Sequence, residues 1–249
     1  MATEHKHSTN TFFAVNLTLM YSNKYARSGT LIRFVDPSGM IWKETKDEDI
    51  ANKLQQQVTY RDKSLAKQET KINAKIEKIE NNTKLSAEKK TQRIATQQGK
   101  LENVQAQRKI LSNFNEGITQ LGNSSTVFTF NTVEHGTTAA LSSMSDGTVV
   151  INNYGTVGNR AHETTHAIQY DNGEISFSKL GGSDVKFHSD YRGLEIQAYG
   201  TEYSITNGIV PSSDAKYPRT VFGITIQWLY GLKDPNTGEY HYTPSNYSR

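Results

Sequence analysis

Two histidines and a glutamate stand close together in the order His162-Glu163-Thr-Thr-His166. On an α-helix, residues i and i+4 lie on the same face, so His162 and His166 would offer two imidazoles to one metal ion. Glu163 would stand beside that metal, where a carboxylate can take a proton from a water molecule. The spacing therefore predicts a Zn²⁺ site with His162 and His166 as ligands and Glu163 as the catalytic base.

The flanking residues predict a helix over this motif. Thr148–Ile151 is a β-branched run typical of a strand, and an Asn/Gly-rich loop follows it. Ala161, Ala167 and Ile168 then hold helical positions, and Gly173 provides a stop. Strand, loop, HExxH helix and glycine stop is the order that a zincin metallopeptidase needs. The other interpretation is two helix-surface histidines near a glutamate.

A catalytic zinc ion usually takes three protein ligands, so a third ligand must come from further along the chain. Glu195, Tyr199 and Glu202 fall on one face of a helix that we expect to begin near Tyr191. A glutamate on a second helix, about thirty residues after His166, suits a zincin with a glutamate ligand, so we predict Glu195. The other downstream candidates are Glu174, Asp184, His188, Asp190, Glu202 and His241.

These parts predict metal-assisted hydrolysis of a peptide bond. Zinc polarises the scissile carbonyl and lowers the pKa of a water molecule towards about 7. Glu163 would accept the water proton and return it to the leaving amine. The oxyanion needs a further donor, for which we predict Tyr199 as the catalytic residue. The other candidates for this donor are Tyr191, His188 and Arg192. The strand at residues 148–152 could pair with an extended substrate backbone.

Composition narrows the functional classes. The 249 residues suffice for one large domain or two small ones, and a mean hydropathy of −0.67 indicates that part of the chain is extended and solvated. A net charge of +3 is too small to imply nucleic-acid binding. The absence of cysteine excludes disulfides and cysteine–zinc sites, and no apolar run is long enough to span a membrane. The N-terminus has no apolar signal core, so we expect export without a secretory signal peptide.

We predict an α+β protein with three regions. Residues 1–40 carry two short strands and a turn. Residues 41–122 carry apolar residues at helical spacing and form a long antiparallel helical hairpin that resembles a coiled coil. Residues 123–249 form a zincin-like domain, with a small mixed sheet, the HExxH helix and the second ligand-bearing helix. The stretch from Arg61 to Lys109 holds thirteen Lys/Arg against six Asp/Glu, which we interpret as a solvated helix face or as a docking arm for a partner.

Two segments are similar to a known family. Residues 32–40, Ile-Arg-Phe-Val-Asp-Pro-Ser-Gly-Met, resemble the end of the RHS-repeat-associated core, whose closing motif is Asp-Pro-x-Gly followed by Leu or Met. In that family a variable C-terminal toxin begins after this motif. The Asn-Asn-Pro that usually precedes the motif is absent here.

The second segment resembles the zincin metallopeptidase toxins found at the ends of such proteins. Those toxins have HExxH-Ala-x-Gln-Tyr/Phe and then Gly-x-Ile/Leu-Ser-Phe, which residues 162–170 and 173–177 match. They later carry a Glu-x-x-Ala-Tyr element, matched by Glu195-Ile-Gln-Ala198-Tyr199. The resemblance covers about 50 residues of the third region and about 10 near the N-terminus, and it independently favours Glu195 as a ligand.

The resemblance implies a zinc endopeptidase toxin that a specialised bacterial secretion system delivers into target cells, where it cuts a protein. It also implies that the producing bacterium makes an immunity protein that binds the toxin. Two other hypotheses remain open. The basic hairpin could be an interaction module beside an inactive zincin part, or the zinc site could hydrolyse a bond other than a peptide bond, as a deamidase does.

Overall fold

The computed structural model describes residues 42–134, 139–206, 208, 218–233, 237–240 and 242. All of these residues belong to one compact unit, residues 33–249. The strands and the turn expected within residues 1–40 lie outside the described residues. The described part combines α-helices with two small sheets, which confirms the α+β class. The region limits at residues 40 and 122 stay predictions.

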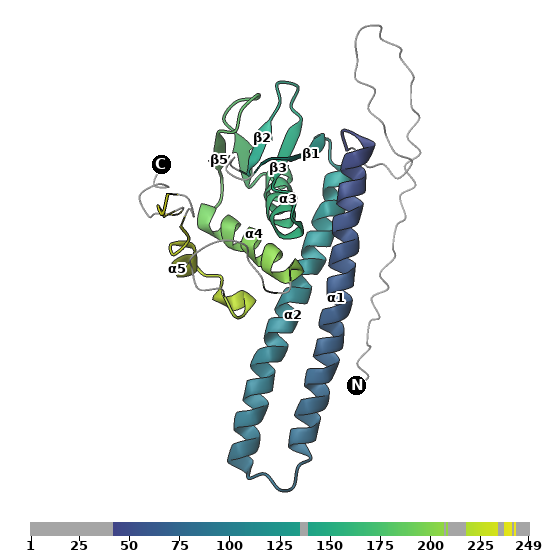
Figure 1. Cartoon of the computed structure of the whole chain (residues 1–249), viewed down its shortest axis with the longest axis vertical. Helices are drawn as coiled ribbons and strands as arrows, with labels where there is room; N and C mark the ends of the chain where they lie inside the picture. Colours follow the sequence, from purple (N-terminus) through teal and green to yellow (C-terminus); the bar gives the residue numbers. More distant parts are fainter. Residues whose placement is uncertain are drawn as a thin grey trace, which may run out of the picture. The chain divides into compact units, whose positions relative to one another are not determined.

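Two long helices, α1 (Thr45–Glu80) and α2 (Ala87–Asn123), form the expected antiparallel hairpin and run side by side in Figure 1. The Ser86 hydroxyl accepts a hydrogen bond from the Lys89 amide and so caps the start of α2. Within the described residues, no helix combines the length and the apolar character that crossing a membrane requires.

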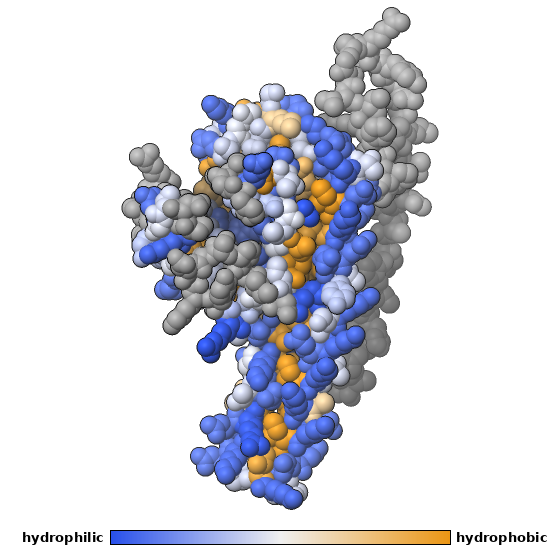
Figure 2. Space-filling view, viewed as in Figure 1, coloured by the Kyte–Doolittle hydropathy of each residue, from blue (hydrophilic) through white to orange (hydrophobic). Residues whose placement is uncertain are grey.

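Apolar residues at intervals of three and four form the seam between α1 and α2. The seam is fully buried at Leu65 and Leu111, and half-buried towards the turn, at Ile79 and Ile94. Figure 2 shows this apolar seam between hydrophilic side chains along the lower part of the hairpin. Basic residues such as Lys100 are exposed, as a solvated helix face requires.

The sheet beside the hairpin has three strands, β1 (Phe128–Thr132), β2 (Leu141–Ser143) and β3 (Val149–Asn153), in the order β1-β3-β2. β3 runs parallel to β1 and antiparallel to β2. The buried Asp47 carboxylate, at the start of α1, accepts a hydrogen bond of 2.9 Å from the Phe130 amide. This bond fixes the sheet to the hairpin.

The place of β3 corrects one expectation. We expected residues 148–152 to offer a free backbone edge to an extended substrate. β3 is instead the central strand, and β1 and β2 pair with its two edges. A β-branched run indicates a buried strand, but the run alone does not say which neighbours the strand has.

Helix α3 (Val157–Asp171) carries the HExxH motif. The Thr156 hydroxyl caps its start by accepting a hydrogen bond from the Asn159 amide. The helix ends where Gly173 adopts φ 75°, a left-handed conformation that glycine enters without strain. The expected stop is therefore confirmed.

Two short strands, β4 (Ile175–Phe177) and β5 (Val185–Phe187), pair in antiparallel fashion after α3. They lead into helix α4 (Tyr191–Ile205), which begins at the expected residue. The Asp190 carboxylate caps this helix by accepting a hydrogen bond from the Arg192 amide.

The last described elements are the 3-10 helix η1 (Val221–Gly223) and the short helix α5 (Ile226–Leu229), both of which contact α4. An antiparallel bridge joins Lys233 to Tyr240. The bridge flanks residues 234–236, which lie outside the described part.

The hairpin packs against the two helices that carry the candidate site. Gly117 permits a close approach of α2 to α3, because an added Cβ would lie 2.5 Å from Ile168 Cδ1. The buried Arg61 of α1 donates hydrogen bonds to the Ser204 carbonyl (2.9 Å) and to Gln107 Oε1 (3.0 Å). Ser204 lies in the last turn of α4, where a helix favours a nearby cation.

Candidate metal centre

The two histidines of the motif lie one turn apart on α3. His162 is 7% exposed, and its Nε2 lies 3.2 Å from His166 Nε2. Two nitrogen lone pairs at this distance repel each other unless a cation lies between them. A metal ion held between the two rings would remove this repulsion.

Glu195 of α4 completes the group, because α3 and α4 pack side by side. Its Oε2 lies 3.5 Å from His162 Nε2, and its Oε1 lies 3.5 Å from His166 Nε2. One ligand atom from each of the three residues can be chosen so that all lie within 4.8 Å of one another. The three expected ligands therefore converge on a site that could hold a metal ion.

The donor set fits the expected zinc ion. Zinc in catalytic sites takes imidazole nitrogens and carboxylate oxygens, and two histidines with one glutamate are a common combination. Three protein ligands leave a coordination position for water or substrate. Softer thiolate donors are absent from the chain, which contains no cysteine.

Two further side chains contact the imidazoles at their Nδ1 atoms, on the side of each ring away from the site. Gln169 Oε1 accepts a hydrogen bond of 2.8 Å from His166 Nδ1, which leaves Nε2 of that ring facing the site. Gln169 Nε2 donates to the Leu194 carbonyl at 3.0 Å and so connects α3 to α4. Glu202 Oε2 lies 3.4 Å from His162 Nδ1, a contact too poorly aligned to count as a regular hydrogen bond. Glu202, an alternative ligand in the sequence, therefore stands behind the ring.

Sequence reasoning missed the role of Gln169. The residue lies three positions after His166, so it shares the helix face with that ring. A polar residue at this spacing was the available signal, and the family pattern HExxH-Ala-x-Gln contained it. This spacing alone does not assign the role to Gln169. The assignment also needs the contact of its side-chain amide with the Leu194 carbonyl of α4, which the sequence does not show.

Glu163 is 4% exposed and lies next to the cluster. Burial raises its pKa to about 7, the charge of His162 opposes this rise, and the charges of Glu195 and Glu202 add to it. Asn159 Nδ2 donates a long hydrogen bond of 3.4 Å to Glu163 Oε1. A carboxyl group with this pKa can accept and release a proton near neutral pH.

Burial and the charges of neighbouring residues shift the pKa values of the three predicted ligands. Burial opposes ionisation of Glu195, but the His166 charge and the contacts of His162 outweigh burial and hold the Glu195 pKa well below its usual range. Burial also favours neutral His162, yet contacts with Glu195 and Glu202 raise the pKa of this imidazole well above its usual value. Burial lowers the pKa of His166. A metal ion at Nε2 would therefore compete with protonation of the His162 ring.

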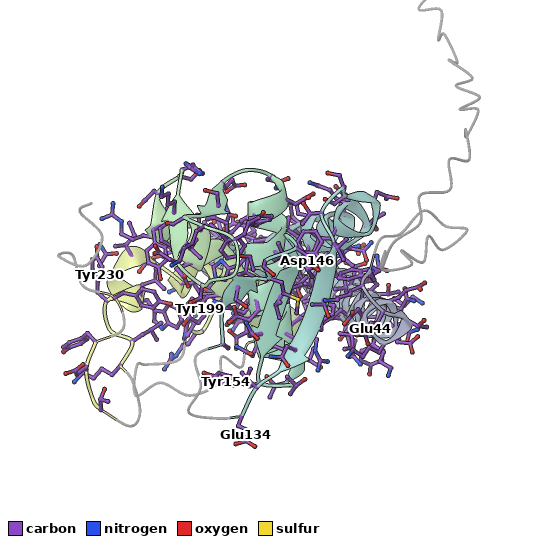
Figure 3. All side chains as sticks on the ribbon, turned by 90° about the horizontal axis from the view of Figure 1, so that it is seen from above. Glu44, Glu134, Asp146, Tyr154, Tyr199 and Tyr230 are labelled. Atoms are coloured by element: carbon purple, nitrogen blue, oxygen red, sulfur yellow. The ribbon has the colours of Figure 1, made fainter. Side chains whose placement is uncertain are left out.

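Two tyrosines border the cluster. The Tyr199 ring packs against the His162 ring with centroids 4.4 Å apart, and its hydroxyl lies 3.4 Å from the Tyr242 hydroxyl. The Tyr242 hydroxyl donates a hydrogen bond of 2.9 Å to Glu195 Oε2. Burial raises the pKa of both phenols, so both remain protonated donors at neutral pH. Tyr199 lies among side chains at the centre of the view in Figure 3, whereas Tyr230 lies at its edge.

Sequence reasoning found Tyr199 but not Tyr242. Tyr199 follows Glu195 by one helical turn, so helical spacing placed both on one face. Tyr242 lies 47 residues from Glu195 along the chain and approaches it only through the path of the chain after α5. The spacing of residues along the sequence therefore could not predict the contact between Tyr242 and Glu195.

The remaining candidates are not among the three converging ligands. His188 Nε2 is 2.8 Å from the Ser176 hydroxyl, on the β4–β5 pair. Asp190 caps α4 and forms an ion pair of 2.9 Å with Arg192, whose Nη1 also donates to the Tyr230 hydroxyl. None of these residues belongs to the metal-binding group found within the described residues. The same holds for Glu174 and Asp184. Tyr191 begins α4, and its ring centroid lies 5.9 Å from that of Tyr242. His241 lies outside the described residues.

A cavity of about 800 Å³ lies between α2, α3, α4 and η1, with none of the three ligands in its lining. Gln169 is the residue that borders both this cavity and the metal cluster. The cavity therefore lies one side chain away from His166. The cavity is not the catalytic cleft, because a substrate must reach His162, His166 and Glu195, and none of these lines the cavity.

Comparisons with known protein families, with curated proteins and with solved structures found no match for this chain. Its function is therefore inferred from its own residues and from the geometry of the site.

Proposed function

We propose that this protein is a zinc-dependent endopeptidase with a zincin-like active site. The observation that carries the proposal is the convergence of His162, His166 and Glu195 beside the buried Glu163. A zinc ion held by the three side chains would polarise the scissile carbonyl and make a water molecule more acidic.

Glu163 performs the proton transfers in this proposal. The carboxylate would accept a proton from the attacking water and later return it to the leaving amine, and burial raises its pKa to about 7 in the metal-free protein. Gln169 orients the His166 ring through a hydrogen bond to its Nδ1, so that Nε2 faces the centre, and Glu202 Oε2 lies 3.4 Å from His162 Nδ1. These contacts support a preformed site rather than one assembled by the substrate.

A tyrosine hydroxyl is our proposed donor to the oxyanion that forms on the scissile carbonyl. Tyr199 is the residue that the sequence indicates, and Tyr242 supplies a second hydroxyl 3.4 Å away. Tyr199→Phe and Tyr242→Phe distinguish the two residues. The variant that loses the donor should lose kcat and keep its zinc content, whereas the other should change neither by much.

We further propose that the peptidase acts as the C-terminal toxin of a bacterial RHS-type polymorphic toxin. Support comes from the resemblance at residues 32–40, 162–177 and 195–199. In this role the chain is delivered into a target cell by a specialised secretion system and cuts a protein there. The producing bacterium then needs an immunity protein that binds the toxin.

The test is growth of bacteria that express the full chain in the cytoplasm, beside the Glu163→Ala variant at matched expression. Glu134→Ala is the control, because this exposed glutamate lies at the end of β1, away from the metal cluster. We expect arrest by wild type and by Glu134→Ala, and growth with Glu163→Ala.

The other outcomes discriminate among the hypotheses. Arrest by all three forms would contradict peptidase toxicity and favour the hairpin as the harmful part. Growth with all three, together with one bound zinc per chain, would contradict a target in the bacterial cytoplasm. Zinc analysis separates an inert interaction module from an enzyme, and product analysis separates proteolysis from hydrolysis of another bond.

A further inference from the structure

A continuous row of aromatic rings leads from the metal cluster to the surface. The row consists of Tyr199, Tyr242, Tyr191 and Phe187, and neighbouring rings have centroids 6.5, 5.9 and 4.4 Å apart. At its inner end Tyr199 packs on His162, and at its outer end Phe187 is 39% exposed. We call these four residues the aromatic row.

The outer end of the row lies on a strand with an open backbone edge. β5 pairs with β4 alone among the strands that the structure describes. Ser178 donates to the Asp184 carbonyl and His188 donates to the Glu174 carbonyl, so the even-numbered residues of β5 face β4. In an antiparallel pair the intervening residues direct their N–H and C=O groups outwards. The backbone groups of residues 185 and 187 therefore face away from β4.

The open edge and the metal cluster are close in the chain and are joined by the contacts of the aromatic row. Phe187 precedes Glu195 by eight residues, and the turn between them leads directly into α4. Tyr191 and Tyr242 fill the gap, and the Tyr242 hydroxyl donates to Glu195 Oε2. The rings therefore extend from this edge to a side chain that contacts the ligand Glu195.

We propose that the outer edge of β5 and the aromatic row bind the substrate segment next to the scissile bond, and that they select a large apolar side chain there. Backbone pairing with β5 supplies affinity that depends little on sequence, and the exposed Phe187 ring supplies selectivity. Substitution of the substrate side chain by an acidic one would leave a negative charge against an aromatic surface. This inference rests on the proposed peptidase function, whose substrate class it defines.

The test measures binding of a defined probe, the capped pentapeptide acetyl-Thr-Val-Phe-Val-Thr-amide, to the zinc-loaded Glu163→Ala full chain. The comparison peptides are the same sequence with a central aspartate and the same sequence with N-methylated valine amides. We expect the phenylalanine peptide to bind roughly tenfold more tightly than either comparison peptide.

Two variants in the Glu163→Ala background identify the surface. Phe187→Ala should abolish the preference for the phenylalanine peptide, and Phe187→Leu should restore most of it. Phe222→Ala is the matched control, because Phe222 is 57% exposed but lies on η1, outside the aromatic row. This control should bind all three peptides as the parent does.

The outcomes separate this inference from the proposed function. Equal binding of the three peptides, no binding, or an unchanged preference in Phe187→Ala would overturn the inference. If the expected preference is found but zinc-loaded wild type cleaves no peptide, the docking surface stands and the peptidase proposal fails. If wild type cleaves peptides without regard to Phe187, the peptidase proposal stands and the docking surface fails.

Discussion

Replacing Glu163 by glutamine should stabilise the metal-free protein at neutral pH, although it should abolish hydrolysis. Glu163 is 4% exposed, and its pKa is raised to about 7, first of all by burial. The ionised form is therefore disfavoured in the folded protein relative to the unfolded chain, where the carboxyl group is hydrated. Glutamine has nearly the same shape and no charge, so it removes this conflict.

The magnitude follows from the two pKa values. The folded value is about 7 and the ordinary value is 4.5, a rise of about 2.5, which corresponds to roughly 3 kcal/mol. The buried carboxyl group destabilises the folded protein only when it is ionised, so it costs no stability while it holds its proton. Below pH 4.5 both states hold the proton and the group contributes nothing to the pH dependence. From pH 4.5 to 7 the unfolded state releases the proton first, so the wild type loses stability as pH rises.

The assay is urea unfolding of wild type and Glu163→Gln in the presence of a chelator, at pH values from 4.5 to 8. The difference in unfolding free energy should grow in favour of the variant by up to about 3 kcal/mol and level off above pH 7. Glu134→Gln, at an exposed site, should follow the wild type at every pH. If the unfolding free energies of wild type and Glu163→Gln had the same pH dependence, the raised pKa of Glu163 would be refuted.

Three further outcomes follow from the same contacts. His166→Ala should lose zinc, because it removes one of three ligands, and metal analysis that found full occupancy would reject this residue as a ligand. Gln169→Leu should weaken zinc affinity by about 10- to 100-fold, because it frees His166 Nδ1; a chelator competition titration measures this change, and unaltered affinity would exclude the orienting role. Gly117→Ala should destabilise the chain by about 1–3 kcal/mol, because its Cβ would lie 2.5 Å from Ile168 Cδ1, and an unchanged urea midpoint would show that α2 and α3 can separate without loss.

Local patterns were sufficient to predict the ligand-bearing helices. The HExxH spacing fixes which residues share a face of α3, and a glycine stop marks the end of that helix. Glu195, Tyr199 and Glu202 were expected on one face of a second helix, which α4 confirms. Both inferences depend only on helical geometry, which the sequence carries within a few residues.

Contacts between distant segments could not be predicted in this way. Helical spacing puts Glu195 and Glu202 on one face, but only the packing of α4 on α3 decides that Glu195 reaches both rings and Glu202 stands behind His162. Tyr242 reaches Glu195 through the chain path after α5. The pairing of β3 on both edges likewise depends on β1 and β2, and the nearer of these, β2, ends six residues before β3 begins. The β-branched run of β3 does not identify either neighbour.

Mapping of new protein N-termini in bacterial cells that express the full chain tests the central claim most directly. Wild type and Glu163→Ala are induced to matched levels, and free N-termini are labelled and identified by mass spectrometry. We predict a defined set of new N-termini with wild type that is absent with Glu163→Ala. Identical sets of N-termini from the two strains, with one zinc ion bound to each purified protein, would contradict the claim that this site is a peptidase.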